Sequence, residues 1–335
     1  MSELVTVGQA FKQGVAEEMR TDDTIFVIGT DLVRRGGHFA QVKGLADEFG
    51  LARVRDAPIS EAAMVAAGVG AALSGMRPIV DLNFIDFSLG AMDEIINQAA
   101  KMRYMSGAPV PLVIRASSGV ALYASQHNNS LEGWFAETPG LFVVAPSTPA
   151  DTKGLIKTAL RGEDPVIFLM HKRLSGTRGT VGGPDEVVPL GSAAIRRPGR
   201  HVTMLAWGAM VAKAVTAADE LAVDGVEAEV IDLRTLFPVD LATIEASVRR
   251  TGRVLVLSES PRVGGVAAQV AAQVQESVFD WLDAPVHRIG AAHSPIPHNP
   301  TLIEALIPQP ADIVSAVRTS MRRWPSTDPA SADLG

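Results

Sequence analysis

The sequence alternates short apolar runs rich in β-branched residues with longer helical stretches, and this alternation constrains the fold more than any other feature. It is typical of a mostly parallel sheet that is covered by helices on both faces. Strands are predicted at Thr24–Gly29, Arg77–Leu82, Pro111–Arg115, Leu141–Ala145 and Pro165–Met170. Helices are predicted at Thr6–Arg20, Ser60–Leu73, Ala91–Met105, Ser130–Ala136 and Ala150–Arg161. Each of the later helices begins near a Ser, Thr or Asp that is able to cap it.

The alternation stops between Lys172 and Arg200, where Gly, Pro and charged residues gather, and this predicts an interdomain linker. A second α/β unit follows. Its predicted strands are Val202–Trp207, Glu227–Leu233, Arg253–Ser258 and Val286–Ile289, and its predicted helices are Met210–Leu221, Leu241–Arg250 and Val266–Phe279. A length of 335 residues suits two domains of this kind. We therefore expect an α/β protein with a first domain at 1–175, a linker at 176–198, a second domain at 199–323 and a disordered tail at 324–335.

Composition excludes several classes of function. The formal net charge of -7 is spread along the chain and argues against a nucleic-acid partner. The chain has no cysteine, which excludes a disulfide framework, a thiolate metal site and a cysteine nucleophile. Charges or prolines interrupt every apolar stretch before it reaches membrane-spanning length, so no membrane segment is expected. The N-terminus has neither signal-peptide nor transit-peptide character, and a cytoplasmic location is the default expectation.

Two local motifs are better explained by packing or turns than by ligand binding. Gly68-Val69-Gly70 lies inside a predicted helix rather than at a strand-to-helix turn, so close helix packing is favoured over a dinucleotide fingerprint. Gly264-Gly265 does lie between a strand and a helix, where backbone amides are able to meet an anion, but a tight turn explains it equally well.

Four segments carry the functional signal. They are Asp56-Ala57-Pro58-Ile59-Ser60-Glu61, Asn83-Phe84-Ile85-Asp86-Phe87, the stretch from Asp93 to Gly107, and Gln126-His127. Their order and spacing resemble the pyrimidine-binding domain of the β subunits of thiamin-diphosphate-dependent 2-oxoacid and acetoin dehydrogenases. The resemblance extends over essentially residues 3–320, and it implies a second domain like the transketolase C-terminal domain.

The functional prediction depends most on Glu61. Taken alone, a glutamate that opens a helix is favoured by the helix dipole and needs no catalytic role. The resemblance implies instead that Glu61 hydrogen-bonds the aminopyrimidine of the cofactor and so promotes deprotonation of the thiazolium carbon, which requires a carboxyl shielded from water. Phe87 is by itself a core aromatic at a strand end, but the resemblance implies that it stacks on the pyrimidine. Ile59 and Asn83 match positions that line the same ring.

His127 lies in a loop that departs from the family pattern. The usual run of Gly and Ala ending in Gln-His-Ser-Gln is replaced by Leu122-Tyr123-Ala124-Ser125-Gln126-His127-Asn128-Asn129. A lone loop histidine is more often a solvated or hydrogen-bonding residue. The resemblance implies a catalytic role beside the substrate carbon, in proton transfer or acyl transfer to a lipoyl arm. Leu122 and Tyr123 are then candidates for narrowing the substrate pocket.

The resemblance also implies ions and partners. A structural K⁺ would be held by backbone carbonyls, and the matching positions are Leu112, Ala159, Leu160, Gly162 and Asp164. The diphosphate and Mg²⁺ need a Gly-Asp-Gly motif, which this sequence lacks, so an α subunit is expected to supply that half of the site. The implied assembly is a heterotetramer of two α and two β chains with a lipoyl-bearing acyltransferase core as a further partner. The second domain would serve mainly in dimerisation and docking.

Three alternatives remain open at this stage. The chain resembles an acetoin dehydrogenase β subunit as well as the 2-oxoacid enzymes, and the sequence does not name the substrate. Half of a two-chain transketolase shares this fold and its glutamate, although the Asp93–Gly107 stretch favours the dehydrogenases. A scaffold subunit without catalysis is the third alternative, which the altered loop around His127 suggests and which Glu61 and Phe87 argue against.

Overall fold

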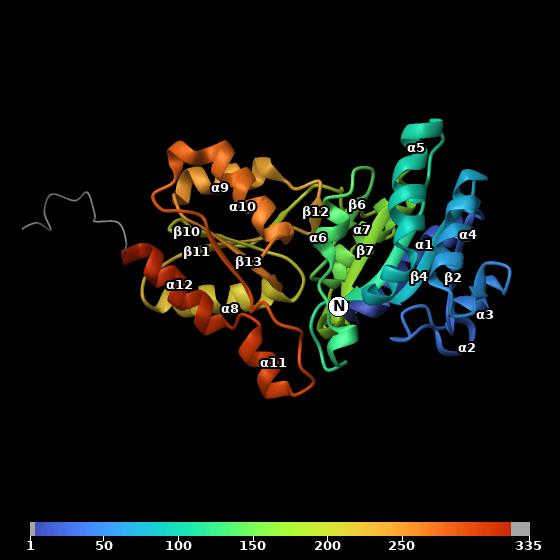
Figure 1. Ribbon diagram of the computed structural model, residues 1–335, viewed down its shortest axis with the longest axis horizontal. Helices are drawn as coiled ribbons and strands as arrows, with labels where there is room; N and C mark the ends of the chain where they lie inside the picture. Colours follow the sequence, from blue (N-terminus) through green and yellow to red (C-terminus); the bar gives the residue numbers. More distant parts are fainter. Residues whose placement is uncertain (1–3, 323–335) are drawn as a thin grey trace, which may run out of the picture.

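The computed structural model describes residues 4–322. The chain forms two lobes, each built on a sheet with helices on both faces (Figure 1). Within the described residues the sheet of the first domain has seven strands, in the order β12 (Thr235–Phe237), β6 (Phe142–Val144), β7 (Val166–His171), β5 (Val113–Ser118), β4 (Arg77–Phe84), β2 (Ile25–Gly29) and β3 (Val54–Asp56). All neighbours are parallel except β12 and β6. Every residue of β5 and β7 is buried, as expected for central strands of a parallel sheet.

Helices cover both faces of this sheet. One buried cluster lies under α1 (Val7–Thr21), α2 (Leu32–Arg35), α3 (Leu45–Phe49) and α7 (Pro149–Arg161). The other lies under α4 (Glu61–Leu73), the 3-10 segment η1 (Ile85–Ala91), the π-helical segment η2 (Glu94–Ala99), α5 (Ala100–Ser106) and α6 (Glu132–Ala136). A capping box between Thr6 and Gln9 starts α1. The helices α1 and α7 approach so closely that a Cβ at Gly14 would lie 2.6 Å from Cγ2 of Ile156.

The second domain repeats the plan on a smaller sheet. Within residues 4–322 this sheet has five strands, in the order β14 (His287–Ala291), β13 (Val254–Pro261), β10 (Val202–Ala206), β11 (Ala228–Asp232) and β9 (Ala194–Arg197). Only β9 is antiparallel to its neighbour. The flanking helices are α8 (Ala209–Val223), α9 (Leu241–Thr251), α10 (Gly265–Val278), η5 (Phe279–Trp281), α11 (Pro300–Leu306) and α12 (Pro310–Arg322).

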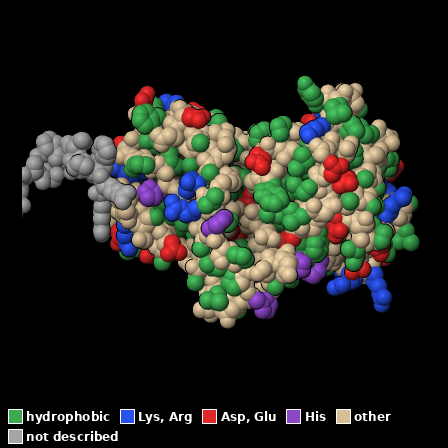
Figure 2. Space-filling model, in the orientation of Figure 1, with side chains coloured by type: hydrophobic (Ala, Val, Ile, Leu, Met, Phe, Trp, Pro, Cys, Tyr) green, Lys and Arg blue, Asp and Glu red, His purple; other side chains and the backbone are tan. Residues whose placement is uncertain are grey.

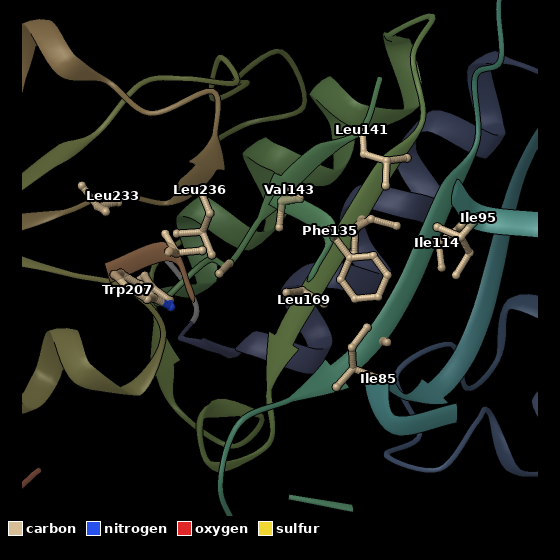
Figure 3. Close-up of a cluster of buried hydrophobic side chains, with 14 of the residues drawn as sticks. Ile85, Ile95, Ile114, Phe135, Leu141, Val143, Leu169, Trp207, Leu233 and Leu236 are labelled. Atoms are coloured by element: carbon tan, nitrogen blue, oxygen red, sulfur yellow. The ribbon is translucent and has the colours of Figure 1, made fainter. Parts of the chain in front are cut away.

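The two domains share one core. The buried cluster beneath α4 and α6 continues into the second domain, because it includes Trp207, Leu233 and Leu236 as well as Val143 and Phe135 (Figure 3). The strand β12, although it follows the second domain's β11 in the sequence, pairs with β6 of the first sheet. The two domains are therefore joined by packing and by backbone pairing.

Most predicted elements are confirmed, with three differences. The predicted helix Ala91–Met105 is helical throughout, but Ala91 ends the 3-10 segment η1 and Glu94–Ala99 is π-helical, which residue periodicity does not reveal. The predicted helix Ser130–Ala136 begins two residues later, at Glu132. The predicted linker contains β9 and the short strand β8 (Arg178–Gly179), which pairs with β1 (Val5–Thr6). The predicted tail at 324–335 lies outside the described residues, and the domain boundaries remain a prediction.

The surface on the face shown in Figure 2 mixes acidic, basic and apolar side chains. Among the helices of residues 4–322, none combines the length and the apolar character that a membrane crossing requires.

Candidate active site

The candidate site residues follow the carboxyl ends of adjacent strands. In the register of the sheet, Gly29 of β2 lies opposite Asp56 of β3 and Asp81 of β4, and Ser118 of β5 lies opposite His171 of β7. The strands therefore end at one edge, which is where open parallel sheets bind ligands. The chain leaves β3 towards Ile59 and Glu61, leaves β4 through Asn83 towards Phe87, and leaves β5 towards His127, so the fold brings the predicted residues to one edge.

Glu61 is the first residue of α4, and α4 packs against η1, which carries Phe87. Its side chain is half-buried and has no hydrogen bond or ion pair within residues 4–322. Ser60 precedes the helix but does not cap it with its side chain, contrary to the expectation from sequence. Ile59 is 81% exposed. The shielding from water that the expected role of Glu61 requires is therefore incomplete in the single chain.

Asn83 forms a local turn within the last residues of β4, where the pairing with β5 is irregular between Asp81 and Phe84. Its φ angle is 61°, a left-handed conformation that Asn tolerates better than most residues. The turn is braced because Oδ1 of Asp81 accepts a hydrogen bond of 2.9 Å from the backbone N–H of Asn83. The Asn83 side chain in turn accepts from the backbone N–H of His38 at 3.3 Å. This turn carries the chain from β4 into η1 and so delivers Phe84 and Phe87 to the site.

Aromatic side chains gather around Phe84. The His127 imidazole stacks on this ring at 5.1 Å and lies edge-on to Phe87 at 5.3 Å, so two of the predicted residues are in contact range. Tyr123 lies 5.4 Å from Phe84, as its predicted role at the pocket requires, whereas Leu122 is 58% exposed. Nδ1 of His127 is buried and has no hydrogen-bond partner among the described residues.

The cluster also contains two residues that the sequence did not indicate. His38 and Phe39 lie 4.8 Å and 5.8 Å from the Phe84 ring. They belong to the connection between α2 and α3, far in sequence from every predicted site segment. Burial, reinforced by the nearby guanidinium groups of Arg35 and Arg115, lowers the pKa of His38, so its imidazole is neutral near pH 7.

A buried lysine lies behind the aromatic cluster. Nζ of Lys172 is 5.5 Å from the centre of the Phe84 ring and donates a hydrogen bond of 2.7 Å to the carbonyl of Gly119. Burial lowers the pKa of Lys172 to about 8. Asp86 lies on the same side of the site, where its Oδ1 accepts from the backbone and side chain of Asn129 and its Oδ2 is buried without a partner in residues 4–322.

Family models match both domains. The model described as the transketolase pyrimidine binding domain matches residues 3–177, and the transketolase C-terminal domain matches residues 191–313. The chain is 42% identical to the β subunit of acetoin:2,6-dichlorophenolindophenol oxidoreductase of Cupriavidus necator, over 96% of this chain and 99% of that one. It is 40% identical to the 2-oxoisovalerate dehydrogenase β subunit of Bacillus subtilis, over 92% and 96% of the two chains. The pyruvate dehydrogenase E1 β subunit of Rhizobium meliloti is 41% identical, over 94% of this chain and 69% of that one.

This chain belongs to the transketolase-like family of E1 β subunits. The relatives are subunits of oxidoreductases, and the family implies the use of thiamin diphosphate. A solved structure, a split-gene transketolase described as an inactive β4 tetramer, has the same fold with a TM-score of 0.79, at 24% identity over 95% of this chain and 98% of that one.

The family's cofactor is compatible with the residues at this edge. Nδ1 of His127 and the carboxylate of Glu61 have no partner within residues 4–322 and offer polar atoms, and the half-buried Phe87 offers an aromatic face, as a flat heterocycle with ring nitrogens requires. Among residues 4–322, no group of three His, Asp or Glu side chains is arranged to hold a metal ion.

The proposed family potassium site fits less well. The five matching positions lie together around the end of α7 and the start of β7, at Leu112, Ala159, Leu160, Gly162 and Asp164. Nη1 of Arg77 donates to the carbonyls of Leu160 and Gly162 at 2.9 and 2.6 Å, and its Nε lies 3.4 Å from Oδ2 of Asp22. The carbonyl of Leu112 accepts from the backbone of Val166. A guanidinium cation therefore already stands at the negative end of α7, and these carbonyls do not fit a potassium ion in this arrangement.

Proposed function

We propose that this chain is the β subunit of a thiamin-diphosphate-dependent 2-oxoacid dehydrogenase, which decarboxylates a 2-oxoacid oxidatively and transfers the acyl group to a lipoyl group. The observation that carries the proposal is the gathering of Glu61, Phe87 and His127 at the carboxyl edge of one sheet in a chain of this family. Phe87 and His127 are in contact range, and Glu61 opens the helix that packs against the Phe87 segment.

The residues of this chain have separate roles in the proposed reaction. Phe87 would stack on the cofactor's pyrimidine, with Ile59 and Asn83 lining the same ring, and Glu61 would share a proton with one of its nitrogens. His127, seated between Phe84 and Phe87, would hold or donate a proton beside the substrate carbon. The cofactor, when bound, supplies the electron sink that decarboxylation needs.

The α subunit is part of the proposal. Glu61 is only half-buried and Ile59 is 81% exposed, so a second chain must cover this edge before the carboxyl is shielded from water. The sequence has no Gly-Asp-Gly motif, so the α subunit would also hold the diphosphate and Mg²⁺. We propose two α and two β chains docked on a lipoyl-bearing acyltransferase core, and the cytoplasmic location stays a prediction.

The proposal is tested by Glu61→Gln in the reconstituted α/β enzyme, with 2,6-dichlorophenolindophenol as the electron acceptor. We expect turnover to fall by at least about 100-fold, because the substitution removes the shared proton while it preserves shape. Asp47→Asn is the matched control, since Asp47 is an exposed carboxylate in the first turn of α3. Unchanged turnover in Glu61→Gln would mean that the carboxylate has only a structural role.

An acetoin dehydrogenase is the second candidate. It is favoured by the match to the acetoin-oxidoreductase β subunit over 99% of that chain. A screen of pyruvate, branched 2-oxoacids and acetoin with the same acceptor separates the two. Ketol transfer without lipoamide would instead indicate half of a transketolase.

A further inference from the structure

A carboxylate of the second domain reaches into the first. Glu259 lies near the end of β13 and is 6% exposed. Its Oε2 accepts a hydrogen bond of 3.0 Å from the backbone N–H of Val120 and lies 2.6 Å from Nε2 of His171. Both partners belong to the first domain, so this one side chain crosses the domain boundary. Val120 is the residue from which the chain departs towards His127.

The imidazole of His171 is oriented to donate to Glu259. Its Nδ1 accepts the backbone N–H of Arg173 at 3.2 Å, which assigns the ring proton of the neutral form to Nε2. Burial would raise the pKa of Glu259, but His171 and the amide of Val120 outweigh it and lower the pKa to about 2. Glu259 is therefore a carboxylate at neutral pH, and its hydrogen bonds are charge-assisted.

Gly119, the residue before Val120, also contacts His171. Its φ angle is +83°, and a Cβ at this position would lie 2.1 Å from Nε2 of His171, so the backbone rests directly on the imidazole. The Gly119 carbonyl accepts from Nζ of Lys172. Three side chains, those of His171, Lys172 and Glu259, thus hold the two residues with which the loop begins.

The rest of the loop, residues 119–129, is closed and tied at other points. The backbone N–H of Gly119 donates to the carbonyl of Asn129 at 3.3 Å, so the loop's two ends meet. The Asn128 side chain accepts from the backbone of Ala121 at 2.9 Å. The hydroxyl of Ser125 donates to the carbonyl of Ile296, which is again a residue of the second domain. The loop that carries His127 is thus bound to the second domain through Glu259 and Ile296.

We propose that Glu259 is a positioning residue, through which the second domain fixes the 119–129 loop and so seats the His127 imidazole between Phe84 and Phe87. The second domain then contributes to active-site geometry as well as to assembly. The catalytic part of this inference rests on the proposed function of His127, whereas the structural part does not.

Amide hydrogen exchange of residues 119–131 in the α/β complex tests the structural part. Glu259→Ala removes two charge-assisted hydrogen bonds, and we expect exchange in this segment to quicken by about tenfold or more. Glu259→Gln should quicken exchange less than Glu259→Ala does, because one amide oxygen is able to accept from both Val120 and His171 although the charge is lost. Glu229→Ala is the matched control, since Glu229 is a buried acid of the same sheet, paired with Arg250 at 2.6 Å, that does not touch the loop.

If Glu259→Ala does not fold, Ser125→Ala provides a second test. It removes the hydrogen bond between the exposed Ser125 hydroxyl and the Ile296 carbonyl of the second domain, and we expect hydrogen exchange in the loop to quicken by about threefold. Unchanged exchange in the alanine variant at either position would overturn the proposal. The proposal would also be overturned if Glu259→Ala quickened exchange in the sheet of the second domain as much as in the loop, because Glu259 would then only stabilise the second domain.

Kinetics of the same variants test the catalytic part. We expect Glu259→Ala to lower kcat by up to about 100-fold, the scale of a 1 Å misplacement, with little change in KM and partial recovery in Glu259→Gln. In the His127→Ala variant, Glu259→Ala should lower kcat by less than about twofold more, because both substitutions remove the same contribution, that of the His127 imidazole. Multiplicative losses would refute positioning through His127. A wild-type pair without turnover would refute the proposed function and leave the exchange result standing.

Discussion

The buried ion pair between Asp81 and Arg115 allows a quantitative prediction. The two residues lie opposite each other in the register of β4 and β5, each 1% exposed, with 3.1 Å between Oδ1 and Nη1. Asp81 also accepts from the side chain of Gln41 at 2.6 Å and from the backbone of Asn83 at 2.9 Å. Arg115 donates to the hydroxyl of Ser117 at 2.8 Å. One carboxylate therefore balances the guanidinium and braces the left-handed turn into the site.

Replacing Asp81 with alanine should be severely destabilising. It leaves a buried guanidinium without its counter-charge, which costs about 3–5 kcal/mol. The Gln41 side chain and the Asn83 amide lose an acceptor as well, so the upper part of that range is expected. In contrast, the double variant Asp81→Leu/Arg115→Met leaves no buried charge, so only the lost acceptor of Gln41 and Asn83 remains as a cost, and it should lose about 2–3 kcal/mol.

Urea unfolding followed by far-UV circular dichroism measures both losses. Asp23→Ala is the control, because Asp23 pairs with Arg53 at 3.2 Å but its side chain is 100% exposed, and we expect a change within about 0.5 kcal/mol. The reasoning fails if Asp81→Ala loses less than about 1 kcal/mol. It also fails if the double variant is as unstable as the single one, because charge burial would then not be the cause.

Three further predictions concern packing, a cation and pH. Gly68→Ala should lower the melting temperature, because its Cβ would lie 2.6 Å from Cγ2 of Val80, whereas Gly70→Ala meets nothing within 4 Å and should gain up to about 1 kcal/mol of helix propensity. The wild-type melting temperature should be the same in KCl and NaCl at equal ionic strength, while Arg77→Met should become less stable and be rescued in part by K⁺ alone; a specific K⁺ effect on the wild type would show that Arg77 does not replace the ion. Burial lowers the pKa of Lys172 from 10.5 to about 8, so the stability linked to this group is present above pH 10.5 and is lost as the pH falls through 8, by about 3 kcal/mol. Urea unfolding at pH 7 and pH 10 should therefore show wild type gaining stability relative to Lys172→Met as the pH rises, and a constant difference would contradict this.

The sequence predicts the central strand β7 well because burial on both faces leaves an apolar run. The predicted strand Pro111–Arg115 ends before β5 does, because the buried residues Arg115, Ser117 and Ser118 interrupt the apolar pattern. The sequence places the helix at Ala91–Met105 correctly but does not reveal its π-helical middle, because a π-helical turn has the same composition as an α-helical one. It also misses β12, whose three residues find their partner in the other domain's sheet. Pairing of that kind depends on tertiary structure and leaves no local pattern.

Some residues of the candidate site could be predicted from the sequence, and others could not. Glu61, Phe87 and His127 are recognisable from sequence only because a known family carries the matching residues, since each one alone suits a structural role. His38 escapes sequence analysis altogether: it meets Phe84 because two glycines with positive φ, Gly36 and Gly37, fold the α2–α3 connection over the end of β4. The turn conformation, rather than any spacing of side chains, brings His38 to the site.

Glu61 and Glu259 indicate that two different parts of the assembly complete the site: another chain, and the second domain of this chain. Glu61 has no partner within residues 4–322 and lies beside the 81% exposed Ile59, so its completion must come from another chain. Glu259, in contrast, uses its Oε2 within this chain to bind Val120 and His171 and so holds the start of the loop that carries His127. The isolated chain should then protect the 119–129 loop from hydrogen exchange as well as the α/β complex does, while it shows no turnover. A loop that becomes protected only when the α partner binds would place its organisation at the subunit interface and remove the reason to assign it to the second domain.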